Sequence, residues 1–272
     1  MCFPSPAGAP DSCPKVIQAA KLPIKTYEDS QRVRLRWICR MKKLVSAIAM
    51  SFGWASAAWS APPAALTTLR AVHDLSNAEA GLALQVSFEA TVTYFLPIES
   101  ILFVQDGDLG IFVLDGRDRT LAPGDRVLVQ GKTLASFHPI VISKSVTLLH
   151  HGDLPRPVPA TFDSLILGQH DCVLVTVRAM VRTSNLRVIG SIRDAHLEMI
   201  ADGGYIDATV VSDDTVAIRD DAAGLLSGLL DTEVEVTGIA GGEFDGKMQQ
   251  TGILLHVPTL ADVKVLTQPR II

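Results

Sequence analysis

Clustered carboxylates are the first feature of this 272-residue sequence that could do chemistry. Asp106 and Asp108 flank Gly107, and loops rich in carboxylate oxygens bind calcium. An EF-hand loop, however, has a third acidic ligand before its glycine and a glutamate at its twelfth position, where this chain has Arg117. Asp and Gly are also the residues that tight turns require. We therefore interpret residues 106–109 as a hairpin turn.

Histidines and the thiol of Cys172 are the other candidates for metal binding. His150 and His151 are adjacent, and neighbouring side chains of an extended chain point opposite ways, so we do not expect them to share an ion. Three further histidines have no carboxylate or cysteine at useful spacing: His138, His170 and His256. Cys172 begins the apolar stretch CVLVTV, which predicts a buried and inert thiol. We predict no metal site and no cofactor.

Catalysis would need reactive residues in a recognisable arrangement. The sequence contains no nucleophile elbow, HExxH, P-loop or GxGxxG motif. Serines and histidines are present, but no local pattern pairs them. We therefore predict no catalytic residues and a protein that is not an enzyme. The alternative is an unrecognised hydrolase whose site is assembled from distant residues.

The amino terminus differs in character from the rest of the chain. Residues 1–40 contain scattered prolines and cysteines and a basic run, and we interpret them as an untranslated or disordered extension. Residues 41–60 begin Met-Lys-Lys, continue as an apolar stretch of small residues and offer alanine-rich cleavage positions, which is typical of a secretory signal peptide. A membrane anchor is the alternative, although this stretch is short for a span of roughly 20 residues. We expect a periplasmic or extracytoplasmic protein, associated with the membrane only if 41–60 stays uncleaved.

Charge bears on the class of partner. Nine of the 24 basic residues and three of the 29 acidic residues precede Leu44, which leaves 15 against 26 and a net charge of −11 for the exported part. Such a surface repels phosphates, and no tryptophan follows residue 60 to stack on bases. One basic cluster is present, which we attribute to a solvated strand edge: Arg178, Arg182, Arg187 and Arg193. We therefore predict that nucleic acid is not a partner.

The elements that would position any site are short strands separated by turns. Residues 64–70 are expected to be extended, and 76–79 form a capping box before a helix of about two turns that ends near Gly81. The predicted strands are 85–94, 101–105, 110–114, 126–130 (ended by Gly131) and 141–149, with turns at 106–109 and 123–125. Five strands at this spacing predict an OB-fold-like barrel over 66–150.

The pattern then repeats after a proline-rich linker at 151–159. The repeated elements are a helix with its glycine at 162–168, a strand at 173–183, a hairpin at 197–211 around Asp202-Gly203-Gly204, an added helix at 222–230, a strand at 233–238 and a last strand at 249–257. A repeat of this length predicts a second OB-like module over 160–267. The fold class is therefore all-β, with two tandem OB-fold-like five-stranded barrels, each preceded by a short helix.

Alternation of apolar residues identifies the expected core. On the first strand one face is formed by Val86, Phe88, Ala90 and Val92. Val127 and Phe103 are expected to point into the interior of the first barrel.

The predicted elements over about residues 66–267 contain four short motifs: LFVQD, GIFV, L-PGDRV-V-G and VPTLADVKVL. This pattern resembles the tandem OB-like extracytoplasmic region of acidobacterial-type sensor histidine kinases and related signalling proteins. The resemblance implies a sensor region that precedes a membrane helix and a cytoplasmic output domain. It supplies no catalytic or ligand-binding residues, and this sequence ends at Ile272 with neither of those later parts.

Together these observations predict a non-enzymatic periplasmic module for sensing or interaction, as the N-terminal sensory fragment of a longer membrane signalling protein. The partner would be a small ligand or another protein, and the sequence identifies no ligand-binding residues. A free-standing periplasmic protein that binds a small molecule or a carbohydrate is the alternative.

Overall fold

The structure is a computed structural model that describes residues 64–115, 120–189, 192–212, 222–245 and 249–267. The predictions for residues 1–40 and for the signal segment 41–60 lie outside these ranges. No helix in the described ranges is both long and apolar enough to cross a membrane. The described residues belong to one compact unit, Trp59–Ile272.

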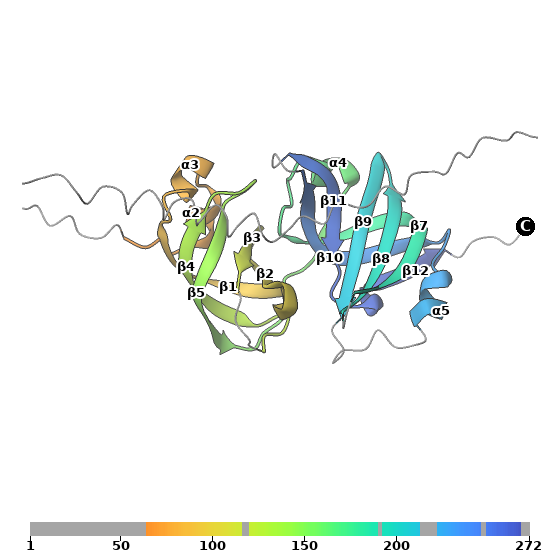
Figure 1. Cartoon of the computed structure of the whole chain (residues 1–272), viewed down its shortest axis with the longest axis horizontal. Coiled ribbons are helices and arrows are strands. Elements are labelled where there is room, and N and C mark those ends of the chain that lie inside the picture. The colour runs from red at the N-terminus through yellow and green to blue at the C-terminus, as the bar shows by residue number, and fades with distance from the viewer. Residues whose placement is uncertain (1–63, 116–119, 190–191, 213–221, 246–248, 268–272) are drawn as a thin grey trace, which may run out of the picture. The chain divides into compact units, whose positions relative to one another are not determined.

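The first module is a five-stranded sheet whose two edges pair with each other (Figure 1). Its strands are β1 (Gln85–Leu96), β2 (Ile101–Asp106), β3 (Leu109–Leu114), β4 (Arg126–Leu134) and β5 (Ile140–His150). Their order is β1-β2-β3-β5-β4, and β4 pairs back onto β1. Since this is the strand order of an OB-fold barrel, the predicted fold class is confirmed for this half.

The barrel interior follows the predicted alternation on β1 and β4. Four β1 side chains are buried in one core: Val86, Phe88, Ala90 and Val92. Val127 and Val129 of β4 join them from the neighbouring strand. Side chains two apart on a strand face the same way, so these positions line the interior together.

Phe103 does not point into the barrel as predicted. Its neighbours Leu102 and Val104 belong to the barrel core, whereas Phe103 packs with Tyr94 and with residues of the second module. Four consecutive residues of β2 are buried, because both faces of this strand are covered. A strand buried on both faces shows no alternation, and therefore its phase could not be derived from the sequence.

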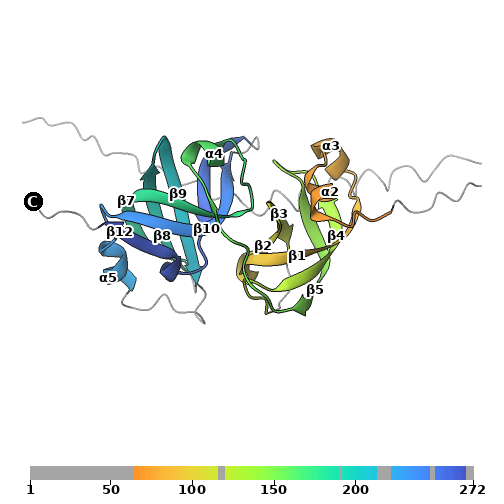
Figure 2. The same ribbon diagram turned by 180° about the vertical axis from the view of Figure 1, so that it is seen from behind.

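Two short helices precede β1 (Figure 2). The predicted capping box is present at α3 (Asn77–Ala80), where the Ser76 side chain accepts from the Glu79 amide, although α3 makes one turn instead of two. The prediction that residues 64–70 are extended was wrong for the last two residues, because α2 (Leu69–His73) begins there with Thr68 as its N-cap. Leu69 and Val72 of α2 are buried in the barrel core, which explains why a helix is favoured at this position.

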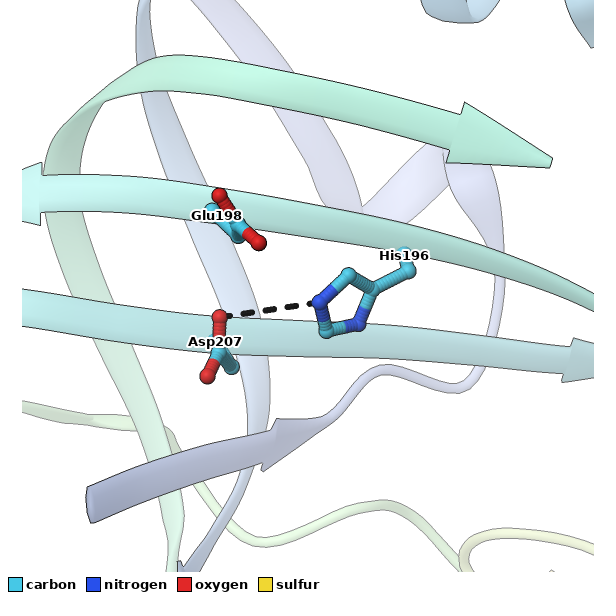
Figure 3. A group of neighbouring side chains, drawn as sticks. All are labelled: His196, Glu198 and Asp207. Atoms are coloured by element: carbon cyan, nitrogen blue, oxygen red, sulfur yellow. Dashed lines mark ion pairs between the residues drawn. The ribbon is translucent and has the colours of Figure 1, made fainter. Parts of the chain in front are cut away.

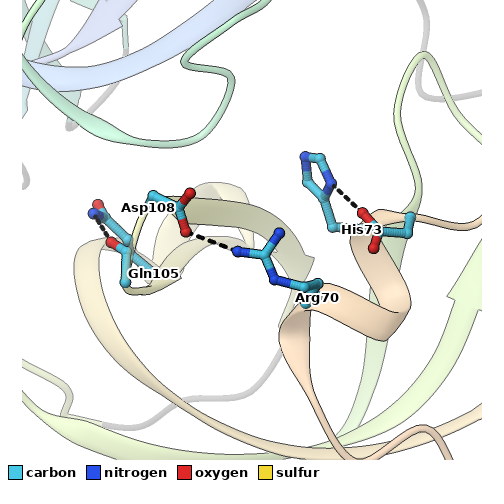
Figure 4. Close-up of polar contacts among 6 residues, drawn as sticks. Arg70, His73, Gln105 and Asp108 are labelled. Carbon is cyan, nitrogen blue, oxygen red and sulfur yellow. Dashed lines mark hydrogen bonds and ion pairs between the residues drawn. The ribbon is translucent and has the colours of Figure 1, made fainter.

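The turn at 106–109 is a hairpin turn, as predicted, and Gly107 adopts a φ of 63° in it. Arg70 on α2 donates to Asp108 at 3.0 Å, and the Gln105 side-chain amide donates to the Gly107 carbonyl at 2.9 Å (Figure 4). Arg126 similarly lies 3.0 Å from Asp106. Both carboxylates of the turn are therefore paired with arginines, which supports a structural role.

The second module repeats the same strand order. Its main strands are β7 (Leu174–Ile189), β8 (Ile192–Ala201), β9 (Gly204–Ser212), β10 (Glu233–Phe244) and β11 (Gln250–His256), in the order β7-β8-β9-β11-β10 with β10 paired to β7. Two short strands are added at its margins: β6 (Val158–Pro159) on β7 and β12 (Val263–Thr267) on β10. The strand at 249–257 is therefore not the last strand.

Helices occupy the predicted positions in this module. α4 (Phe162–Ile166) has Thr161 as its N-cap, and Gly168 follows it with a φ of 67°. α5 (Ala222–Ser227) lies in the connection to β10, next to β7. The predicted linker is shorter than expected, because its last two residues, Val158 and Pro159, pair with β7 as the strand β6.

Several strands run further than predicted, and Gly131 shows the reason. We expected this glycine to end the fourth strand, but β4 continues to Leu134 after a shift of register at this point. A Cβ at Gly131 would lie 2.2 Å from the Ile142 carbonyl oxygen on β5. The glycine thus allows a close approach of two strands at a bulge instead of ending one.

The two modules share a small apolar core. Tyr94, Leu96 and Phe103 of the first module pack with Cys172, Leu174 and Ile239 of the second. Buried Gln105 accepts a hydrogen bond from the Leu174 amide at 2.9 Å. The outer face of β2 is therefore joined to the start of β7 by apolar packing and by a buried hydrogen bond.

Candidate functional site

A pocket of about 370 Å³ lies where β2 and β3 of the first module meet the second module. The first module contributes β2, β3, the loop between β4 and β5, and His73 of α2. The second module contributes Asp171, Cys172 and parts of β10 and β11. OB-folds bind ligands on the face of their second and third strands and with the loop between the fourth and fifth. The pocket is therefore at the usual binding face of the first barrel, with the second barrel as its other wall.

Aromatic rings form much of the pocket wall. The Phe103 ring centroid lies 5.3 Å from that of Phe112 and 5.0 Å from that of His256. In the loop between β4 and β5, Phe137 lies 4.6 Å from Phe244 of β10. These are tilted pairs at the distances that aromatic side chains prefer. The pocket consequently offers apolar ring surfaces contributed by both modules.

His138 and Asp171 are the main polar pair of the pocket. The Nε2 atom of His138 lies 4.0 Å from Oδ2 of Asp171, which is too long for a hydrogen bond. This Nε2 atom is buried and has no hydrogen-bond partner within the described ranges. The ring of His73 stacks on that of His138 at 6.4 Å. Because buried polar atoms are normally bonded, the free nitrogen indicates a place for a polar group of a ligand.

Burial shifts the pKa of two adjacent acidic groups in the pocket. It raises the pKa of Asp171, an effect that His138 partly opposes. Burial, with Asp171 nearby, also holds the pKa of the Cys172 thiol well above its usual value, so this thiol is a poor nucleophile. Cys172 is buried, as predicted. Among the part of the chain that the structure describes, no lysine or arginine lines the pocket.

We predict that His256 makes the fold less stable at low pH. Burial lowers the pKa of His256 from 6.5 to about 4. The folded chain therefore takes up this proton only at lower pH than the unfolded chain. The stabilisation is fully present above pH 6.5 and is lost as pH falls from 6.5 to 4, by about 3 kcal/mol in total.

Urea unfolding of wild type and His256→Phe at pH 7 and pH 4.5 would measure this loss. Burial also raises the pKa of four carboxyl groups: Glu99, Asp171, Asp207 and Glu243. A raised carboxyl pKa stabilises the fold as pH falls, which is opposite to the effect of His256. These groups are common to both proteins, so the difference between the two isolates His256. Equal changes with pH in the two proteins would contradict the prediction.

The structure places the predicted histidines in different surroundings. His150 is exposed and bonds to the His151 carbonyl, while His151 lies 2.6 Å from Asp125, so the adjacent pair does not converge on one point. No carboxylate lies at useful spacing from His138 along the sequence, but the fold brings Asp171 to 4.0 Å from it. Both His138 and His256 line the pocket.

The arginine cluster lies on β7 and β8. The pairing of β7 passes from β10 to β8 at Met180, so Arg178 is paired only with β10 and Arg187 only with β8. Three of the four arginines are paired with carboxylates: Arg178 with Glu235 at 3.1 Å, Arg182 with Asp231 at 2.7 Å and Arg187 with Asp194 at 2.6 Å. Their charges are therefore partly neutralised on the outer surface of the barrel.

No protein-family model matches this chain, and no curated protein is significantly similar to it in sequence. Among solved structures, an aspartyl tRNA synthetase from Entamoeba histolytica is 17% identical, with 42% of this chain and 22% of that chain covered and a TM-score of 0.29. A replication protein A heterotrimer bound to ssDNA is 11% identical, with 74% and 52% covered and a TM-score of 0.30. A murine DNA binding protein bound with ds DNA is 12% identical, with 67% and 98% covered and a TM-score of 0.30.

This chain spans about a fifth of the length of the synthetase. The likeness concerns the fold and does not extend to activity. It nevertheless corrects one prediction, because two of these similar structures are complexes with DNA, so the exclusion of nucleic acid as a partner was wrong. The net charge of a whole chain cannot exclude a partner, since binding depends on the local surface and several acidic residues here are already paired with arginines.

Proposed function

We propose that this chain is a non-enzymatic binding module whose small-molecule ligand occupies the pocket between the two barrels. The observation that carries the proposal is the buried, unbonded Nε2 atom of His138 in a pocket lined by aromatic rings. Ligand pockets are mostly apolar with a few polar groups that fix orientation, which fits this composition. The raised pKa of Cys172 argues against a cysteine nucleophile in the same pocket.

The lining favours a ligand that contains a flat aromatic or heteroaromatic ring. Phe103, Phe112, Phe137 and Phe244 offer ring surfaces for stacking or edge contacts. His138 and Asp171 offer sites for one hydrogen-bonding group of the ligand. Because the described residues that line the pocket include no lysine or arginine, a ligand without phosphate or carboxylate groups is favoured.

We further propose that the chain is the sensing part of an extracytoplasmic signalling protein. The pocket is lined by both modules, so a ligand in it would contact both and strengthen their association. A ligand that binds one arrangement of two parts better than another shifts their equilibrium, which is the physical requirement for a sensor. A free-standing binding protein would use the same pocket, and ligand binding alone does not separate the two roles.

Thermal unfolding of the full chain with small ring compounds tests the binding proposal. Indole, benzimidazole and adenine are the probes, and cyclohexanol is the control of similar size without an aromatic ring. At least one aromatic probe should raise the midpoint of wild type, because a ligand that binds only the native state stabilises it. Cyclohexanol should raise it less.

Two variants locate the binding. Phe137→Ala should weaken binding of the active probe about tenfold, the effect of losing one aromatic contact of about 1.4 kcal/mol. Tyr205→Ala removes an aromatic ring that is 69% exposed and does not line the pocket, so it should leave the affinity unchanged. Equal weakening by both variants, or no shift with any aromatic probe, would count against the proposal.

A further inference from the structure

Three side chains with metal-binding groups lie together on the second module, outside the pocket (Figure 3). His196 and Glu198 are two residues apart on β8 and therefore face the same way. Asp207 on β9 pairs directly with Glu198 across the sheet. One imidazole nitrogen and one oxygen from each carboxylate all lie within 4.8 Å of one another.

The imidazole of His196 has no hydrogen bond at either nitrogen among the described residues. Its side chain is only 15% exposed, and its Nδ1 atom is buried without a partner. Its Nε2 atom faces Asp207 at 3.7 Å, beyond hydrogen-bond distance. An ion between the carboxylates would be bound by the Nε2 atom, which faces them without a hydrogen bond.

Two carboxylates face each other in this cluster, since Glu198 and Asp207 are directly paired on neighbouring strands. Arg187 of β7 is engaged with Asp194 at 2.6 Å. A divalent cation between Glu198 and Asp207 would offset the repulsion between their carboxylates.

We propose that His196, Glu198 and Asp207 form a binding site for a zinc ion. Zinc takes imidazole nitrogen at about 2.0–2.1 Å and carboxylate oxygen at about 2.0–2.2 Å, so two ligand atoms of a tetrahedral site lie about 3.4 Å apart. The three groups, which now lie within 4.8 Å of one another, would reach that spacing through rotation of their side chains. An imidazole ligand favours zinc over the harder calcium and magnesium ions.

Three protein ligands leave a fourth tetrahedral position for water or for a group of a partner, as in zinc sites that react or bind instead of only stabilising a fold. Glu198 is exposed, so this position is accessible from solvent. The site is on strands β8 and β9 and shares no residue with the pocket between the modules. The inference is therefore independent of the proposed function.

Zinc titration of the full chain by calorimetry, at neutral pH, tests the site. Cys2, Cys13 and Cys39 lie outside the described residues and are replaced by serine in every protein, because free thiols also bind zinc. One zinc ion per chain is expected. His196→Ala and Asp207→Asn should each weaken its binding by at least about 100-fold, since each removes a direct ligand.

Two controls and one further variant complete the experiment. His150→Ala and His170→Ala remove histidines elsewhere on the chain and should leave zinc affinity unchanged. If His196→Ala does not fold, Glu198→Gln keeps the size of an exposed side chain and should still weaken binding at least tenfold. The site would be refuted by equal zinc affinity in wild type and the ligand variants, by absence of zinc binding, or by tighter binding of calcium than of zinc.

Discussion

Val127→Asp is expected to abolish cooperative folding of the first barrel. Val127 has no exposed surface, and it packs in the barrel core with residues such as Phe88 and Val129. A carboxylate at this position would have no partner, and burying it costs several kcal/mol even if it becomes protonated. The whole stability of a domain is about 5–15 kcal/mol, so one such change can unfold the barrel.

Circular dichroism and urea unfolding of the full chain would measure this effect. Gln130→Asp is the matched control, because it introduces the same side chain on the same strand at an exposed position. The control alters the exposed hydrogen bonds of Gln130 with Ser87 and Ser145, so it should change the free energy of unfolding by about 1 kcal/mol, well below the effect of Val127→Asp. If Val127→Asp melted at the wild-type midpoint, the assignment of the faces of β4 would be wrong.

Gly110→Ala is expected to disrupt the junction between the two modules. A Cβ at position 110 would lie 2.0 Å from the Cys172 carbonyl oxygen and 2.3 Å from the carbonyl carbon. These are backbone atoms, so no side-chain rotation relieves the clash. The Cys172 amide also donates to Ala240 at 2.8 Å, which holds this segment in place. Overpacking of this kind costs up to about 3 kcal/mol or more.

The junction must open locally to accommodate the methyl group, so binding in the adjacent pocket should be lost together with stability. For a folded region of this size, about 3 kcal/mol lowers the thermal midpoint by about 6–12 °C. Gly224→Ala is the matched control, since a Cβ there meets no atom within 4 Å and alanine favours the helix. A Gly110→Ala protein with the wild-type midpoint and unchanged binding of an aromatic probe would contradict the described junction.

The second barrel covers part of the β2–β3 face of the first barrel. In an isolated OB-fold the face of the second and third strands is open to solvent and suits extended ligands. Here residues of β10 and β11 cover part of that face, and the remaining space is a pocket of about 370 Å³. The packing of two similar modules has thus converted an open face into a site of a size that suits a small molecule.

Local features of the architecture could be predicted from the sequence because short-range chemistry determines them. The capping box at Ser76 and Glu79 depends on contacts within one turn of chain. The turn at Gly107 depends on the conformational freedom of glycine. The face of β1 follows from simple alternation, because one side of that strand packs in the core and the other is partly exposed.

The sequence by itself therefore determined two repeated modules, their fold class and most of their strands. Only the tertiary structure decided which residues meet, because that depends on packing between segments far apart in the chain. Phe103 faces the second module since both sides of β2 are covered. His138 meets Asp171 through the junction of the two modules. His196 and Asp207 meet through the register of β8 on β9, in which a shift of one residue would place them on opposite faces.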